Sequence, residues 1–297
     1  MASETESQFE VEGIKLYAKT WKPAGPVRAS IIYVHGFSEH INRYNNFFPL
    51  LTAHGIQVFA WDQRGWGKSA PNRRDWGTTG TTVRVIADIA AFIKHKLPSD
   101  VPLFVMGHSM GGGEVLTLAS DESYKELVNG IRGWILEAPF IGFTPGQEPS
   151  TLKVVLGRLA GRFLPRHQLT HGVPAELMSR DPEVVESVRN DPLCHDTGTL
   201  EGLASMLDRT TILAGGSHKL GAHVQSLFLT HGTADGACSY DKAMKWYGEQ
   251  DQLSDKTVKS YEGAYHQLHA DLCKEEFASD VVKWILERSN APVEAKL

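Results

Sequence analysis

A serine framed by glycines constrains this chain more than any other feature of its sequence. The pentapeptide Gly107-His108-Ser109-Met110-Gly111 follows the apolar run 103–106 and opens a stretch with helical character. Glycines two residues on either side of the serine allow a sharp strand-to-helix turn, in which the central residue takes a strained backbone conformation. The pattern G-x-S-x-G alone is weak, but this context predicts that Ser109 is a nucleophile raised clear of a sheet.

A serine hydroxyl becomes a useful nucleophile when a histidine accepts its proton and a carboxylate orients that histidine. In a strand-turn-helix setting the three residues follow in the order serine, acid, histidine. Asp235 comes shortly after a predicted strand at 224–230, and His266 follows a predicted last strand at 257–261. The chain order therefore predicts Ser109, Asp235 and His266 as catalytic residues.

Other residues are alternatives for two of these roles. Asp208 could supply the acid but falls in a predicted insertion, and Asp241 begins a predicted helix as a capping residue. His269 and His108 are the alternatives for the base, although the turn fixes His108 beside the nucleophile.

Acyl transfer at a serine also requires two hydrogen-bond donors for the oxyanion that forms on the substrate. The backbone N–H of Met110, the residue after the nucleophile, is one candidate. The apolar run 29–34 ends in His35-Gly36-Phe37, so the N–H of Phe37 is the second. The alternative is that His35-Gly36 forms an ordinary strand-to-loop turn.

Short apolar strands alternate with helical segments along most of the chain. The predicted strands lie at 9–11, 14–21, 29–34, 56–61, 103–106, 133–136, 224–230 and 257–261, and the predicted helices at 43–53, 82–97 and 276–287. Such alternation is typical of an α/β fold with a mostly parallel central sheet and helices on both faces.

Nearly ninety residues between the strands at 133–136 and 224–230 do not keep this rhythm. They are too many for a plain loop. The sequence therefore predicts a core formed by 1–139 and 222–297, with a helical cap at 140–221 inserted over the active site.

One cap segment, 151–164, has an amphipathic pattern. Its apolar residues fall on one helical stripe: Leu152, Val155, Leu156, Leu159 and Phe163. Basic residues flank the stripe at 153, 158 and 162. This arrangement suits a helix lying in a membrane interface, where it would bring the pocket mouth to a lipid substrate. The alternative is that the stripe covers the pocket.

Composition favours an intracellular enzyme, and the sequence lacks a dinucleotide-binding motif, so we expect no cofactor. The net charge of −5 argues against general binding of nucleic acid. The polar N-terminus lacks the apolar stretch of a signal peptide, and no run approaches the length of a membrane span. Three cysteines without a C-x-x-C pair argue against disulfides and structural zinc. The C-terminal Ala295-Lys296-Leu297 is similar to a peroxisomal signal, although it could simply be a charged tail.

Two of the cysteines are candidates for the pocket wall. Cys238 lies three residues after Asp235, and Cys194 lies in the predicted cap. We expect both thiols to lie near the path of the substrate; the alternative is that both are buried as small apolar side chains.

Taken together, several motifs resemble those of one known family. They are His35-Gly36-Phe37, Asp62-Gln63-Arg64-Gly65-Trp66-Gly67, the elbow 107–113, Asp191-Pro192-Leu193-Cys194, His231-Gly232-Thr233-Ala234-Asp235 and Tyr261-Glu262-Gly263-Ala264-Tyr265-His266. This set, spread over nearly the full length, resembles the monoacylglycerol lipases of the α/β-hydrolase superfamily. The glycine-rich elbow and the segment 163–166 look closest to the fungal members.

The resemblance implies the α/β-hydrolase fold and a monoacylglycerol substrate, cleaved to glycerol and fatty acid. It carries the catalytic and oxyanion roles onto the five residues named above. The amphipathic cap segment adds an expected peripheral contact with a membrane or lipid droplet surface. A general carboxylesterase or a lysophospholipase would use the same residues. An inactive α/β-hydrolase fold serving as a ligand receptor is the alternative from another class.

Overall fold

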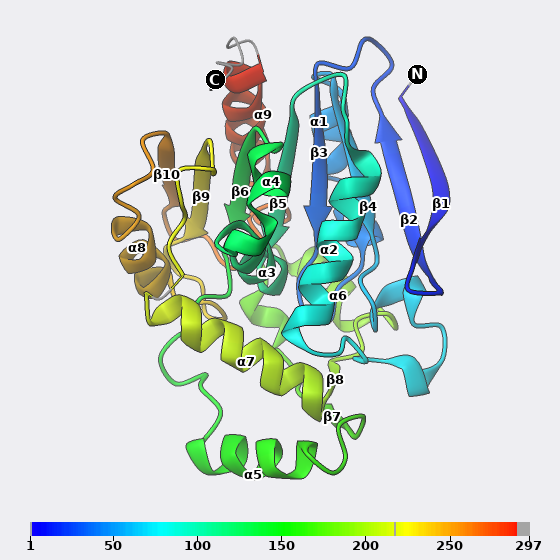
Figure 1. The fold of residues 1–297 in the computed structure, drawn as a ribbon, viewed down its shortest axis with the longest axis vertical. Coiled ribbons are helices and arrows are strands. Elements are labelled where there is room, and N and C mark those ends of the chain that lie inside the picture. Colours follow the sequence, from blue (N-terminus) through cyan, green and yellow to red (C-terminus); the bar gives the residue numbers. More distant parts are fainter. Residues whose placement is uncertain (1, 217, 290–297) are drawn as a thin grey trace.

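The structure, a computed structural model, describes residues 2–216 and 218–289. Its centre is an eight-stranded sheet with the order β1-β2-β4-β3-β5-β6-β9-β10 (Figure 1). The strands are β1 Ser3–Val11, β2 Ile14–Lys22, β3 Ala29–Val34, β4 Ile56–Trp61, β5 Leu103–His108, β6 Gly133–Glu137, β9 Leu227–Gly232 and β10 Lys256–Tyr261. The first two pairs in this order are antiparallel and all the others are parallel. The predicted mostly parallel sheet is confirmed.

Helices cover both faces of the sheet, which explains why β3, β5, β6 and β9 are buried along their whole length. The helices are α1 Phe48–Thr52, α2 Thr82–Lys96, α3 Met110–Ala119, α4 Lys125–Asn129, α8 Tyr240–Gly248 and α9 Lys274–Ser289. In β3, Ile32 and Val34 pack in one core with α2, α3 and α8, whereas Ile31 and Tyr33 pack in the other with α1 and α9. Burial of alternate residues on opposite faces fixes the register of each strand.

Some predicted boundaries were wrong. The helix predicted at 43–53 is a 3-10 turn, η1 (Ile41–Tyr44), followed by the short helix α1. Pro49 lies in the first turn of α1. Proline lacks an N–H and fits a helix only at its start, so a helix running through this position is excluded. Asp241 does not cap α8, because Ser239 accepts the capping hydrogen bond there.

The insertion between β6 and β9 lies beyond the carboxyl ends of the parallel strands (Figure 1). It comprises α5 Thr151–Gly161, β7 Gln168–Thr170, α6 Pro182–Arg189, β8 Thr197–Thr199 and α7 Leu200–Ala214. The antiparallel pair β7-β8 was not predicted. Helix α7 packs on the core, where Arg209 and Glu114 form a buried ion pair at 3.1 Å, and α5 lies farthest from the sheet.

One segment of the insertion, residues 191–199, is anchored to loops of the core. His195 is stacked between Trp66 and Trp76, with ring centroids 4.9 and 4.5 Å away. Burial lowers the pKa of His195 to about 4, so the ring between the two indoles is neutral at physiological pH. The Asp196 N–H donates to Ser38 Oγ at 2.8 Å.

Within residues 2–216 and 218–289, no helix is both long enough and apolar enough to cross a membrane. The C-terminal Ala295-Lys296-Leu297, considered above as a peroxisomal signal, lies outside the described residues.

Close approach of the elbow to β3 makes Gly111 a sensitive position. A Cβ atom there would lie 2.3 Å from the carbonyl oxygen of Val34, and neither backbone segment can move without disturbing the sheet. We expect Gly111→Ala to lower the free energy of unfolding by about 1–3 kcal/mol, the usual cost of overpacking a core. The control is Gly25→Ala, whose Cβ would meet no atom within 4 Å. Urea unfolding measures both, and equal stability of the two variants would contradict the prediction.

Candidate active site

Four loops meet at the carboxyl edge of the sheet, as expected for parallel strands. Phe37 follows β3, Ser109 follows β5, Asp235 follows β9 and His266 follows β10. Phe37, Ser109 and His266 line one cavity, and Asp235 lies directly behind His266. Residues separated by more than 200 positions in the chain are thereby brought together.

Ser109 adopts the strained conformation that the elbow requires. Its backbone angles are φ 53° and ψ −119°, a region that L-residues rarely occupy. A Cβ on Gly107 would lie 2.5 Å from the carbonyl oxygen of Gly111, so the turn closes only with glycine at this position. Ser109 Oγ lies 3.8 Å from Cys238 Sγ, and no hydrogen bond joins it to His266 among the described residues. Catalytic hydrogen bonds are often long until substrate binds.

Asp235 and His266 form a buried pair. The distance between Asp235 Oδ2 and His266 Nδ1 is 2.8 Å, and Asp235 Oδ1 accepts hydrogen bonds from the N–H groups of Ala237 and Cys238 at 2.8 and 2.9 Å. Burial favours the protonated acid, but the charge of His266 and the hydrogen bonds from His231 and His266 outweigh it. The pKa of Asp235 is therefore below its ordinary value, and the carboxylate is ionised at neutral pH.

The alternative residues have other partners. Asp208 forms an ion pair with Arg158 on the surface. The ring of His269 contacts Glu137, with 2.6 Å between Nδ1 and Oε1, and His108 contacts Glu39. Among the described residues considered for these two roles, Asp235 and His266 are the one acid and base that contact each other.

The two oxyanion candidates face the same cavity as Ser109. Within the described part of the chain, the N–H groups of Phe37 and Met110 donate no hydrogen bond to another protein group. Met110 is the first residue of α3, where N–H groups have no partner inside the helix. The Phe37 loop is held by the aromatic contact of its ring with Trp66, at a centroid distance of 4.8 Å.

A buried carboxylate, Glu39, joins three of the catalytic loops. Its Oε2 accepts hydrogen bonds from the N–H of Gly36 at 2.9 Å and from the hydroxyl of Tyr44, and lies 3.0 Å from His108 Nδ1. Its Oε1 accepts a hydrogen bond from Gln267, the neighbour of His266. Burial opposes ionisation of Glu39, but the charge of His108 outweighs it and holds its pKa well below the ordinary value.

The cavity at Ser109 is small and mostly apolar. It has a volume of about 130 Å³, and its apolar lining comes from Phe37, Met110, Phe140, Phe143, Val173, Pro174, Leu177, Met178, Met206, Ala237 and Cys238. A second apolar cavity of about 300 Å³ lies between α5 and α7. Phe143, His171 and Met206 line both cavities. The two spaces are therefore neighbours that share three lining side chains.

Of the residues predicted to line the substrate pocket, some line the cavity at Ser109 and others do not. Cys238 lines the cavity at Ser109 and is buried. Cys194 does not; it lines a separate cavity of about 210 Å³, which shares the lining residues Phe37, Glu39, Val173 and Met178 with the first. The four apolar residues of the α5 stripe line neither the first nor the second cavity and are 53–68% exposed: Leu152, Val155, Leu156 and Leu159.

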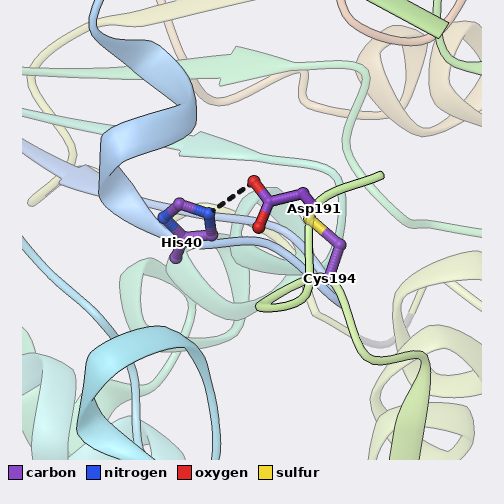
Figure 2. A group of neighbouring side chains, drawn as sticks. All are labelled: His40, Asp191 and Cys194. Atoms are coloured by element: carbon purple, nitrogen blue, oxygen red, sulfur yellow. Dashed lines mark hydrogen bonds and ion pairs between the residues drawn. The ribbon is translucent and has the colours of Figure 1, made fainter. Parts of the chain in front are cut away.

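Among residues 2–216 and 218–289, two groups of side chains bring potential metal ligands close together. Figure 2 shows the first, in which His40 from the core faces Asp191 and Cys194 from the insertion. His40 Nε2 and Asp191 Oδ2 are 2.9 Å apart, and the guanidinium of Arg43 also contacts Asp191 at 3.3 Å. With a cation already on its carboxylate, the group is better suited to joining insertion and core than to holding a metal. The second is the buried network of His108, Glu137 and His269.

Sequence reasoning missed Glu39 and His231. Glu39 lies three residues after Gly36, where no motif indicates a buried charge. His231 stands four residues before Asp235 in the turn that was used to find the acid, and its ring lies against the same carboxylate. The spacing of four residues between His231 and Asp235 across a tight turn is the sequence signal that could have predicted this contact.

The fold and this site define the chain as an α/β-hydrolase. The model of the family described as "Serine aminopeptidase, S33" matches residues 25–272. The chain belongs to this family of serine hydrolases.

Individual relatives of the chain are named as monoglyceride lipases. A monoglyceride lipase homologue of Schizosaccharomyces pombe is 33% identical over 92% of this chain and 72% of its own. The monoglyceride lipase of Mus musculus is 31% identical over 88% of this chain and 82% of its own length. A solved monoglyceride lipase structure from Saccharomyces cerevisiae has a TM-score of 0.85 at 23% identity, covering 96% of each chain, and shares the fold. The resemblance to monoacylglycerol lipases inferred from the sequence is thus confirmed.

The ion pair between His108 and Glu39 makes stability depend on pH. Burial opposes protonation of His108, but Glu39 and Glu137 outweigh it and raise its pKa to about 9. The ordinary value is about 6.5. A raised pKa stabilises the fold fully below the unfolded value, and this contribution is lost as the pH rises through 9.

We therefore expect His108→Gln to lower the free energy of unfolding by about 1–3 kcal/mol more at pH 6 than at pH 9.5. Urea titrations of the variant and the wild type at both values measure the difference. His54→Gln, at an exposed position, is the control. A loss of the same size at both pH values would contradict the raised pKa of His108.

Proposed function

We propose that this protein is a monoacylglycerol lipase, which hydrolyses monoacylglycerols to glycerol and fatty acid through an acyl intermediate on Ser109. One observation carries this function: a serine on a strained elbow opens, together with a histidine-carboxylate pair, into an apolar cavity that adjoins a second apolar cavity. Such a space suits an acyl chain. The relatives named as monoglyceride lipases support the choice of substrate.

The proposed mechanism assigns one step to each group. His266 removes the proton from Ser109 as the hydroxyl attacks the ester carbonyl, and Asp235 stabilises the imidazolium that forms. The N–H groups of Phe37 and Met110 hold the oxyanion. His266 then protonates the departing glycerol oxygen, and water, activated by the same histidine, releases the fatty acid from Ser109.

The family description refers to peptide cleavage, but the cavity favours a lipid ester. An aminopeptidase needs a group that binds the positively charged amino terminus of its substrate. Among the described residues that line the Ser109 cavity, Glu39 is the one carboxylate. Its oxygens are already used by Gly36, Tyr44, His108 and Gln267. A substrate amine would therefore lack a free acidic partner.

Comparison of substrates tests the proposal. Monoolein should be hydrolysed faster than diolein, triolein, lysophosphatidylcholine, a short p-nitrophenyl ester or an aminoacyl p-nitroanilide. Preference for the short ester would instead indicate a general carboxylesterase, and preference for lysophosphatidylcholine a lysophospholipase. Release of p-nitroaniline alone would support the peptidase chemistry of the family description.

Removal of the nucleophile should abolish turnover without unfolding the chain. We expect Ser109→Ala to lower kcat/KM for monoolein by roughly three to six orders of magnitude, with an unchanged melting temperature. Asp235→Asn should lose less, because asparagine still contacts the ring but favours the wrong tautomer. Initial rates and thermal unfolding measure both. Near-normal turnover by either variant would remove that residue from the mechanism.

We also propose that α5 docks the protein on a lipid surface. The helix turns Gly157 and Gly161 toward α7, where a Cβ on Gly161 would lie 3.4 Å from Leu200 Cβ. This contact directs the apolar stripe away from the protein, and Phe163 and Leu164 extend the exposed apolar surface. An apolar face turned to solvent and edged by exposed Lys153 and Arg162 suits a helix lying in the membrane interface.

Leu156→Ser combined with Leu159→Ser tests the docking. The double variant should lose most co-sedimentation with phosphatidylcholine liposomes and show about 10-fold slower hydrolysis of monoolein in bilayers, because less apolar area enters the interface. Hydrolysis of a soluble short ester should not change. Val83→Ser with Leu272→Ser, which removes similarly exposed apolar side chains elsewhere, is the control. Equal losses on the soluble and bilayer substrates would contradict docking through α5.

A further inference from the structure

A second histidine contacts the carboxylate of the catalytic pair. His231, in the carboxyl-terminal part of β9, is fully buried. Its Nε2 lies 3.1 Å from Asp235 Oδ2, the same oxygen that contacts His266 Nδ1. The mechanism above assigns no role to this ring.

The neighbours of His231 determine which of its nitrogens carries the proton. Nε2 lies between two acceptors, Asp235 Oδ2 and the carbonyl oxygen of Cys238 at 3.3 Å, so it must be protonated. Nδ1 is buried and, within the described part of the chain, has no hydrogen-bond partner. A proton on Nδ1 would therefore be unsatisfied. We assign the neutral tautomer, with the proton on Nε2.

We propose that His231 is a positioning residue that holds the Asp235 carboxylate in the orientation required by His266. The inference rests on the proposed function of Asp235 and His266 as the acid and base of a serine hydrolase. It assigns His231 no contact with substrate, because the ring does not line the Ser109 cavity.

The donors around Asp235 explain why such a residue is needed. Oδ1 is fixed by two backbone N–H groups, from Ala237 and Cys238. Without His231, the one donor on Oδ2 among the described residues would be His266, the group that must gain and lose a proton in each cycle. A neutral second donor limits rotation of the carboxylate about its Cβ–Cγ bond. It also leaves the full negative charge available to stabilise the imidazolium of His266.

Two nearly isosteric variants separate hydrogen bonding from packing. Glutamine can place an amide N–H close to the position of Nε2, whereas methionine fills a similar volume without a donor. We expect His231→Gln to stay within about 3-fold of the wild-type kcat. His231→Met should lose about 10- to 100-fold, the effect of one hydrogen bond to a charged group, with KM within about 2-fold. His231→Leu is a second donor-free variant if the methionine variant does not fold.

The same comparison in the Asp235→Asn background tests whether His231 acts through Asp235. There the Gln and Met variants should differ by less than about 3-fold, because residues that act as a unit are not additive. Melting temperatures of the Gln and Met variants should agree. Equal kcat for the two variants, a change confined to KM, or a full loss that persists in the Asp235→Asn background would overturn the proposal.

Rates are measured with a short p-nitrophenyl ester and as phosphonylation of Ser109 by a fluorophosphonate, so the test does not depend on the natural acyl chain. Failure of the wild type to react with the fluorophosphonate would refute the proposed function itself. A reactive wild type with equally reactive Gln and Met variants would refute only the role of His231.

Discussion

The geometry of the active site depends on the buried carboxylate of Glu39. A charge taken out of water is costly unless hydrogen bonds and an opposite charge satisfy it. The partners of Glu39 come from the loop after β3, from the end of β5 and from the loop after β10. The loops that carry Phe37, Ser109 and His266 must therefore take compatible positions before this charge is satisfied. The buried side chain of Glu39 thus fixes the relative positions of the loops that carry Phe37, Ser109 and His266.

Asp235, on the other side of His266, is also a buried carboxylate that hydrogen bonds and charge stabilise. Two backbone N–H groups donate to its Oδ1, and ring nitrogens of two histidines lie 2.8 and 3.1 Å from its Oδ2. Preorganised donors of this kind need little rearrangement when charge develops during the reaction. Ser109 differs from these groups, because its strained backbone is held by the close packing of glycines rather than by charge.

The sequence was sufficient for the features that depend on strand ends and on chain order. Ser109, Asp235 and His266 each follow an apolar run, and parallel strands bring such positions to one edge. The strands β7 and β8 were missed because three residues are too few to show a period. The apolar stripe on α5 was predicted from the sequence, but periodicity alone does not show which face of the helix packs on the protein. The close approach of Gly161 to Leu200 shows that the glycine face does so. Glu39 was missed because its partners His108 and Gln267 are distant in the chain. His231 was missed because its partner Asp235 lies within the same turn.

The anchoring of residues 191–199 has a consequence for how the enzyme can vary. Stacking of His195 between two indoles and the contact of Asp191 with His40 fasten this part of the insertion to the core loops. Among the described residues, no ring stacking or ion pair of that kind ties helix α5 to the core loops; the helix rests on α7, with an apolar cavity beneath it. A shift of α5 therefore alters the space offered to an acyl chain while the dipoles around Ser109 keep their places. Recognition of the lipid and speed of the chemical step are then separable properties, which substitutions in different parts of the chain can change independently.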